Sequence, residues 1–549
     1  MRDQNKQLYI LLFVLALVVN FAGINIKFFT DDPGLYASIS KNLIYRKEFF
    51  ELFTYNQDWL DKPHFPFWMA MLSFKLFGIS VWAYRLPALL FFLLSLLYTW
   101  LFTKKHYGEN IAWIAVLILA TSQHVIMSNT DIRAEPYLMA LVIGSIYHIS
   151  RLEKRFTFRD FLLAALLTAC AIMTKGIFVI VAIYGALLGQ LIFQKKFTQV
   201  FQPKWLFLVL LTLIFTFPEF YALYIQFDLH PEKLIFNKHH VSGIRWFLWD
   251  SQFGRFVNSG PITRKSGSIF FYAHTLLWAF APWCLIFYYA VYKSLKEIWL
   301  KQKLVEYYTI SGGLLLLLLF SLSGFQLPFY TNILFPLFAV ITAPICYKQL
   351  SRFGTSYRLI GLWVCIILLP VAILLINYLS GSPHILLFVT ECVVFGGVVF
   401  VILSRNESPN LKAFFLSCCT VLFANFYLNT IFYNELVDYK GQIKAADYIN
   451  QPAFDNYRIY SLKTENNVFQ FYSKRPVDYT PLSSFNQFKP VSPSVFYVNH
   501  KSMDSLILEH ADFKVIKAFQ NYPQENILPA FIDLKTRSRV LDSVYLITK

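Results

Sequence analysis

The chain has 549 residues, of which 56% are hydrophobic and only 15% are charged, and its formal net charge is +17. Soluble domains are about 45–50% apolar, so this composition excludes an ordinary soluble protein and indicates an integral membrane protein. The excess Lys and Arg residues lie in short clusters between hydrophobic runs. This placement favours contact with the lipid bilayer and excludes nucleic acid as a partner.

The hydrophobic runs predict an α-helical polytopic membrane protein. The first run, Leu8 to Phe28, has the length of a span and no small-residue cleavage site after it, so we predict an uncleaved first helix. A span needs about 17–25 mostly apolar residues, and by this criterion the sequence predicts about thirteen transmembrane helices. They lie near residues 8–28, 80–103, 110–128, 134–150, 160–175, 176–194, 205–226, 268–293, 305–323, 328–347, 357–379, 384–404 and 411–433.

The short loops predict the orientation of these helices. Every second loop is basic, namely 104–105, 151–159, 195–204, 293–303, 348–358 and 405–412. The positive-inside rule places these loops in the cytoplasm, with the N-terminus inside and the C-terminus outside. The long loops 29–79 and 227–267 then lie on the outer face.

The last part of the chain has a different character. Residues 434–549 contain four strand-like runs, "YRIYSL", "SVFYVNH", "FKVIKAF" and "SVYLITK", and a predicted helix from Val437 to Asn450. We therefore predict two domains, a transmembrane domain over 1–433 and an extracytoplasmic α/β domain over 434–549.

Ionisable residues gather on the predicted outer face. They are Asp31, Asp32, Asp58, Asp61, Lys62, Asp131, Arg133, Glu135, Lys175, His239, His240, Arg245 and Arg255. Any one of these side chains could simply extend toward the lipid head groups. As a group, acids beside fixed cations suit an anionic substrate together with a general base.

The alternative function is that of a membrane transporter or flippase for a lipid-linked or anionic substrate. Transporters usually place ionisable residues near the bilayer midplane, in repeated halves of the chain. Here the charges gather on one face and no repeat is visible, which favours an enzyme. An oligosaccharide ligase, a polymerase or an acyltransferase would also be a membrane enzyme, but the histidines form no set typical of an acyltransferase.

Five motifs occur in a specific order. They are "DPGLYA" from Asp32 to Ala37, "DKPHFPFW" from Asp61 to Trp68, "RAEPYLM" from Arg133 to Met139, "TKG" from Thr174 to Gly176 and "FQLPFYTNILFPLFA" from Phe325 to Ala339. This order resembles the GT-C glycosyltransferases, closest to the lipid A aminoarabinose transferases and protein O-mannosyltransferases. By motif, the resemblance spans roughly residues 5–345.

The resemblance implies a function on the outer face of the bacterial cytoplasmic (inner) membrane. A GT-C enzyme of this branch transfers a sugar from a polyprenyl-phosphate donor, with inversion, to a glycolipid such as lipid A or to a protein. Asp32 matches the catalytic aspartate of the family, four residues before Tyr36, and would act as the general base. If the base lies elsewhere, Asp131 and Glu135 are the other candidate catalytic residues.

The remaining site residues follow from the same resemblance. Lys62, Lys175 and Arg133 are candidates to hold the donor phosphate, where negative charge develops as the lipid leaves. Candidate substrate contacts are Asp31, Tyr36, Asp61, His64, Trp68, Arg255, Gln326 and Tyr330.

Three positions depart from the family pattern. Asp61 replaces the more usual Glu, Gln326 stands where relatives often carry Lys, and Gln252 stands where some relatives place a His. No cofactor is required by the sequence. A divalent metal ion is the one candidate cofactor, with Asp61, His239 and His240 as candidate ligands, although the adjacent histidines are not a metal motif by themselves.

Overall fold

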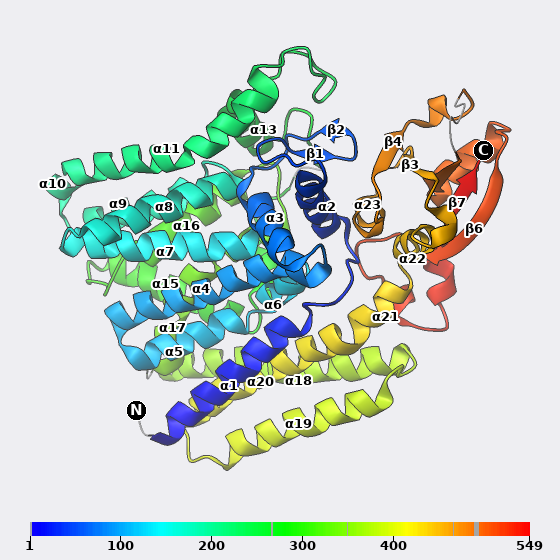
Figure 1. Cartoon of the computed structure of the whole chain (residues 1–549). Helices are drawn as coiled ribbons and strands as arrows, with labels where there is room; N and C mark the ends of the chain where they lie inside the picture. Colours follow the sequence, from blue (N-terminus) through cyan, green and yellow to red (C-terminus); the bar gives the residue numbers. More distant parts are fainter. Residues whose placement is uncertain (1–2, 265–266, 349, 465, 488–492) are drawn as a thin grey trace.

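The computed structural model describes residues 3–264, 267–348, 350–464, 466–487 and 493–549. Most hydrophobic runs form helices whose axes run in broadly similar directions in one bundle, and a mixed β-sheet lies at one end of this bundle (Figure 1). We call this the sheet end. The bundle helices are α1 (Asp3–Ala22), α4 (Val81–Tyr107), α5 (Glu109–Ala120), α6 (Gln123–Thr130), α7 (Glu135–Lys154), α8 (Phe158–Lys175), α9 (Val179–Phe193), α11 (Pro203–Leu223), α14 (Phe271–Ala279), α15 (Cys284–Trp299), α16 (Tyr308–Leu322), α17 (Phe335–Tyr347), α18 (Arg352–Leu379), α19 (Ile385–Ser404) and α20 (Pro409–Tyr427).

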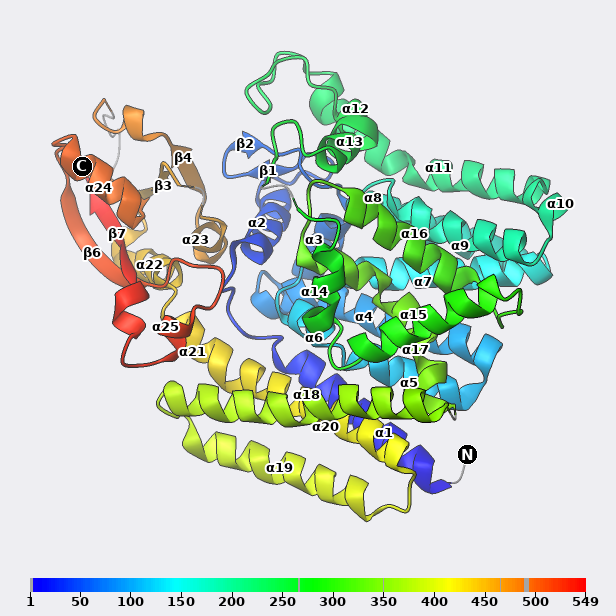
Figure 2. The ribbon, with the colours of Figure 1, turned by 180° about the vertical axis from the view of Figure 1, so that it is seen from behind.

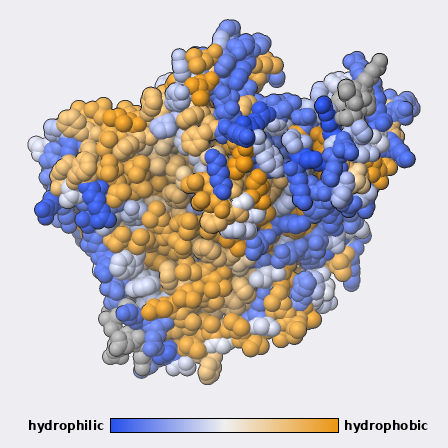
Figure 3. Space-filling model, in the orientation of Figure 1, coloured by the Kyte–Doolittle hydropathy of each residue, from blue (hydrophilic) through white to orange (hydrophobic). Residues whose placement is uncertain are grey.

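The surface of the bundle is that of a multi-pass membrane protein. Hydrophobic residues cover much of its face in Figure 3, whereas the region around the sheet is mainly hydrophilic. Among the described residues, six helices are long and apolar enough to cross a membrane, or seven if the bent pair α5–α6 forms one span. Several other apolar helices are shorter, so the predicted count of thirteen spans is not confirmed.

Two predicted spans are each broken into two helices. The predicted helix 110–128 bends by 54° between α5 and α6, at Thr121 and Ser122. The predicted helix 268–293 is interrupted between α14 and α15, where Pro282 lacks the N–H group that a continuous helix needs.

The segment 29–79, predicted as a long loop, contains regular secondary structure. It contains α2 (Asp31–Tyr45), a short hairpin of β1 (Phe53–Thr54) and β2 (Gln57–Asp58), and α3 (Phe65–Phe77). Asp31 and Asp32 occupy the first turn of α2, where acidic side chains interact favourably with the helix dipole.

The C-terminal sheet has five strands in the order β4-β3-β5-β7-β6. Strands β3 (Arg458–Leu462), β5 (Ser494–Val498), β6 (Lys514–Asn521) and β7 (Asp542–Thr548) coincide with the four strand-like runs, and β4 (Val477–Thr480) is additional. Strand β3 pairs in parallel with β4 and β5, whereas β7 pairs antiparallel with β5 and β6. The predicted helix 437–450 is divided into α21 (Tyr433–Asp438) and α22 (Gly441–Ile449).

Helix α2 joins the bundle to the sheet region. It lies beside α23 (Asn467–Tyr472) in both views of the ribbon (Figures 1 and 2). The two helices approach closely because Gly34 has no side chain. A Cβ atom at this position would lie 2.9 Å from the backbone nitrogen of Val468.

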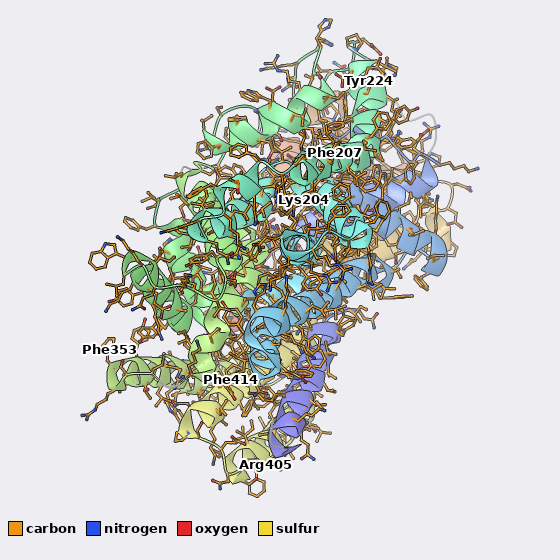
Figure 4. All side chains as sticks on the ribbon, turned by 90° about the vertical axis from the view of Figure 1, so that its left-hand side faces the viewer. Lys204, Phe207, Tyr224, Phe353, Arg405 and Phe414 are labelled. Atoms are coloured by element: carbon orange, nitrogen blue, oxygen red, sulfur yellow. The ribbon has the colours of Figure 1, made fainter. Side chains whose placement is uncertain are left out.

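The opposite end of the bundle faces the viewer in Figure 4, with Lys204 and Arg405 labelled. Lys204 lies in the first turn of α11 and Arg405 directly follows α19. The Lys204 ammonium donates a hydrogen bond to the Leu152 carbonyl at 2.9 Å, which ties the start of α11 to α7. Residues of two loops predicted to be basic thus lie at the end opposite the sheet.

Candidate functional site

Three groups of ion-paired residues lie at the sheet end of the bundle. The first group joins α2 to the loop between α6 and α7. The Arg133 guanidinium contacts Asp32 at 2.5 Å and Asp131 at 3.0 Å, and Thr30 also donates a hydrogen bond to Asp131. The Asp32 side chain is 44% exposed and that of Arg133 only 16%, so the carboxylate is accessible while the cation is held in place.

The second group joins the loop after β2 to α13 (Ser251–Phe256). Asp61 forms ion pairs with both Lys62 and Arg255. Burial alone would raise the pKa of Asp61, but the two cations outweigh burial and lower it. Burial and the neighbouring Arg255 lower the pKa of Lys62 to about 8, so this lysine remains largely protonated at neutral pH.

The third group is a buried ion pair between Glu135 at the start of α7 and Lys175 at the end of α8. The exposed fractions of the two side chains are only 2% and 4%, respectively. The Lys175 ammonium also lies 4.0 Å from the centroid of the Tyr330 ring, within the range of a cation–π interaction. A cation is therefore fixed at this position by a carboxylate and an aromatic face.

The three groups are parts of one cluster. Tyr36, which is buried, interacts electrostatically with Glu135, Asp32 and Asp61, one acid from each group. Lys175 interacts in the same way with both Arg255 and Arg133. Acids and cations from five separate segments of the chain therefore share one site.

A cavity of about 330 Å³ adjoins this cluster. Lys175 and Arg255 line it together with Tyr330, and most of the other lining residues are apolar, namely Ile177, Phe178, Ile180, Val181, Phe253, Phe256, Leu319, Phe320 and Phe325. A smaller pocket beside it is lined by Asp61 and Lys62 and shares Lys175 and Arg255 with the larger cavity. An apolar groove thus meets a charged pocket at two cations.

Several residues predicted to contact the substrate instead form hydrogen bonds with other residues of the chain. Asp31 accepts hydrogen bonds from the backbone and side chain of Asn467, at 3.1 and 2.7 Å. His64 is 1% exposed and its Nδ1 atom lies 3.0 Å from Glu219, in α11. The Trp68 indole donates to the Phe49 carbonyl at 2.8 Å. The polar groups of Asp31, His64 and Trp68 therefore hold the protein together, because each is engaged by another part of the chain.

Gln326 is buried near the cavity but does not line it. Its Nε2 atom donates to the carbonyl of Ser321 at 3.1 Å. Among the described residues its Oε1 atom has no hydrogen-bond partner. Phe325, the residue before it, lines the cavity instead.

The candidate metal ligands are not assembled into a metal site. Asp61 is occupied by Lys62 and Arg255, while His239 and His240 are exposed and His239 Nδ1 lies 2.9 Å from the Glu232 carbonyl. In the part of the chain that the structure describes, no group of three or more His, Cys, Asp or Glu side chains is placed to hold a metal ion. The three predicted ligands are therefore not placed to bind one metal ion together.

Three further residues contribute to the site. Of these, Ser251 carries no signal in the sequence, whereas Phe329 lies inside the motif 325–339 and Gln252 is one of the departures from the family pattern. Phe329 lies under the Arg133 guanidinium at 4.3 Å from its centroid, and Ser251 lines both the cavity and the small pocket. Gln252 packs so closely on Gly176 that a Cβ there would lie 2.4 Å from its Nε2 atom. Gly176 has φ = +113°, a conformation that other residues rarely adopt, which explains the glycine of the "TKG" motif.

Comparisons with known proteins agree with the motifs. A family model described as dolichyl-phosphate-mannose-protein mannosyltransferase matches residues 61–221. An uncharacterised protein of Aquifex aeolicus is 24% identical over 384 residues, which are 69% of this chain and 71% of that protein. An undecaprenyl phosphate-alpha-4-amino-4-deoxy-L-arabinose arabinosyl transferase of Edwardsiella ictaluri is 24% identical over 358 residues, 64% of this chain and 61% of that relative.

Solved structures show the same fold. ArnT from Cupriavidus metallidurans bound to undecaprenyl phosphate superposes with a TM-score of 0.74 at 16% identity, covering 92% of this chain and 96% of that one. The apo state of the same protein gives a TM-score of 0.73 at 15% identity, with 92% and 95% covered. The predicted likeness to lipid A aminoarabinose transferases of the GT-C type is confirmed.

Proposed function

We propose that this chain is an integral membrane glycosyltransferase that moves a sugar from a polyprenyl-phosphate donor to an acceptor. The sequence matches and the shared GT-C fold support glycosyltransferase activity. The observation that carries the proposal is the apolar cavity of about 330 Å³ that ends at Lys175 and Arg255.

The cavity suits both parts of such a donor. Apolar side chains from α9, α13 and α16 would bury the first isoprene units, and this burial is worth about 25 cal/mol per Å² of apolar surface. Lys175 and Arg255 would contact the phosphate, and Lys62 lies in the adjoining pocket. Because fixed cations need no reorganisation during the reaction, they stabilise the charge that develops on the departing lipid phosphate.

Asp32 is the general base of the proposed reaction. One of its oxygens is held by Arg133, and the side chain remains 44% exposed, so it is accessible to an acceptor hydroxyl. In a single displacement, the acceptor oxygen forms a bond to the anomeric carbon as its proton passes to Asp32. The bond from that carbon to the phosphate oxygen breaks, the electron pair leaves with the polyprenyl phosphate, and the anomeric configuration is inverted.

The proposed setting is the outer face of the bacterial inner membrane. The basic loops would be cytoplasmic and the sheet region, as an extracytoplasmic α/β domain, would lie beside the site. The acceptor would be lipid A, another glycolipid or a protein. The Asp131 side chain is 26% exposed and also accepts a hydrogen bond from Thr30, and Glu135 is 2% exposed and paired with Lys175. The greater exposure of Asp32, 44%, favours it over both as the base.

The test is transfer by the purified chain in nanodiscs that contain a mixture of radiolabelled polyprenyl-phosphate sugars and candidate acceptors. We expect the wild type to consume one donor and Asp32→Asn to lose at least about a hundredfold in rate, the usual scale of general base catalysis. Asp438→Asn, which changes an exposed carboxylate on α21, is the matched control and should retain full activity.

A groove variant tests the donor site separately. Val181→Trp places a large side chain in the cavity and should abolish donor binding while Leu188→Trp, on the exposed face of the same helix, should not. Vectorial movement of the labelled lipid without cleavage, in wild type and Asp32→Asn alike, would contradict the proposal and favour a transporter.

A further inference from the structure

A second cavity, of about 240 Å³, lies away from the ion cluster. Three segments line it, and their elements converge between the bundle and the sheet in Figures 1 and 2. They are the last turns of α2, the turn of the β1–β2 hairpin and the stretch from α23 into β4. The cavity-lining residues are Lys41, Asn42, Tyr45, Arg46, Tyr55, Asn56, Gln470, Arg475, Pro476, Val477 and Asp478.

One residue that lines this junction cavity has an unsatisfied amide oxygen. Gln470 is 4% exposed, and its Oε1 atom has no hydrogen-bond partner among the described residues. A buried polar atom without a partner costs about 1–3 kcal/mol, so such atoms are usually satisfied by a ligand or water. The rim is open, because Tyr45, Arg46 and Asn56 are exposed.

The walls of the cavity are held in place by the protein itself. The Lys41 ammonium donates to three carbonyls at the end of α23, those of Gln470, Phe471 and Ser473, at 2.9, 2.9 and 2.6 Å. An ammonium has three N–H groups, so Lys41 has none left for a ligand. The cavity is therefore a fixed feature of the junction.

The cavity has an excess of positive charge. Arg46 and Arg475 line it together with Lys41, against the single acid Asp478. Arg46 uses one N–H group on the Tyr55 carbonyl at 3.1 Å, and a guanidinium has five. The remaining donors are able to bind a phosphate or carboxylate through charge-assisted hydrogen bonds.

We propose that the junction cavity binds a single sugar ring that carries an anionic group. At about 30 Å³ per water molecule, its volume equals that of about eight waters. This is below the roughly 300 Å³ at which pockets for drug-sized ligands begin. Arg46 suits the anionic group, whereas Arg475 already donates to the carbonyls of Phe454, Tyr457 and Ile449 and adds mainly its charge. The amides of Asn56 and Gln470 suit ring hydroxyls, and two tyrosines border the space.

The cavity is remote from the proposed reaction centre. Arg46 follows Asp32 by fourteen residues along α2, which corresponds to about 21 Å at 1.5 Å per residue. The ligand is therefore either a soluble sugar phosphate or a distant part of a glycolipid head group, and its binding can be measured without any transfer reaction.

The test is calorimetric titration of the purified full chain in detergent with glucose 1-phosphate, glucose and inorganic phosphate. We expect glucose 1-phosphate to bind more tightly than either part alone. Arg46→Gln should weaken binding about tenfold or more, as expected when a charge-assisted hydrogen bond is lost. Asn56→Asp, on the exposed turn, should weaken it by repulsion, whereas Lys474→Gln, beside the cavity but not lining it, should bind normally.

The outcomes separate clearly. Equal binding of inorganic phosphate and glucose 1-phosphate, absence of binding, or binding that Arg46→Gln and Asn56→Asp leave unchanged would overturn the proposal. Asn56→Asp keeps the test valid if Arg46→Gln does not fold. Competition by nanodiscs that carry a phosphorylated glycolipid would support the site and assign its ligand to a membrane head group, and lack of competition beside binding of the free probe would assign it to a soluble sugar.

Discussion

Asp31 accepts two hydrogen bonds from Asn467, a residue 436 positions later in the chain. The neighbouring Asp32 pairs with Arg133 in the ion cluster. Adjacent carboxylates at the start of α2 thus point to two different parts of the molecule, one to the sheet region and one to the proposed site. Asp31 anchors the turn that presents Asp32.

This anchor is part of a larger clamp on α23. Asp31 contacts the first residue of α23, and Lys41 contacts the carbonyls at its end. An acid and a cation of α2 therefore lie at the positive and the negative end of the α23 dipole, respectively. Ser38 adds a hydrogen bond to the Asn467 carbonyl at 2.9 Å. Hydrogen bonds at both ends of α23 therefore fix its position relative to α2.

Loss of the hydrogen bond between Asn467 and Asp31 should weaken the attachment of α2 to the sheet region. We expect Asn467→Leu to destabilise the protein by about 1–3 kcal/mol, because the Asp31 carboxylate loses a side-chain donor while partly buried. The transfer rate should fall as well, since Asp32 is then less well positioned. Thermal unfolding and single-turnover rates measure the two effects. Asn486→Ala, at an exposed position of the same region, is the control, and equal behaviour of the two variants would contradict the clamp.

The protonation of Asp31 should affect stability. Burial raises the pKa of Asp31 to about 6, although the hydrogen bonds from Asn467 oppose this shift. Because its pKa is higher in the folded state, ionisation of this group lowers the free energy of unfolding as the pH rises from about 4 to about 6. Asp31→Asn should remove this contribution, and thermal unfolding midpoints of variant and wild type across that range measure it. An unchanged pH profile would contradict the assignment.

The pair of Glu135 and Lys175 has a structural and a functional component that can be separated. Lys175→Met leaves a buried carboxylate unpaired and should destabilise the protein by about 3–5 kcal/mol. Adding Glu135→Gln should restore most of the stability but not the affinity for the donor phosphate. Unfolding curves measure the stability of both variants, and binding of polyprenyl phosphate measures their affinity for the donor. Full donor affinity in the stable double variant would show that Lys175 does not bind the donor phosphate.

His64 is expected to be structural despite its place in the "DKPHFPFW" motif. Its ring and backbone both contact the buried Glu219, and Nε2 lies 2.9 Å from the Phe50 carbonyl. His64→Ala should therefore destabilise the protein strongly, whereas His64→Gln, which can still donate to the carboxylate, should be milder. Activity per folded molecule should change little in His64→Gln. A raised KM for the donor in a stable His64→Gln variant would instead indicate a substrate contact.

The nature of the chain as a membrane protein, the motif set and the acids and cations of the site could be predicted from the sequence. Hydrophobic length and local charge are properties of short segments, so they need no knowledge of the fold. For this reason the sequence predicts Asp32, Asp61, Lys62, Arg133 and Lys175 together on one membrane face, and the structure places them in one cluster.

Only the tertiary structure decided how these residues pair. The motif register selects Asp32 over Asp31 as the base, but the sequence could not show that Asp31 is held by Asn467, on a helix that no local pattern connects to α2. It could not show that Glu219 holds His64, or that the end of α2 and the β1–β2 hairpin enclose a cavity with β4. Such contacts depend on the packing of distant segments, where burial and the need to satisfy polar groups choose the partners.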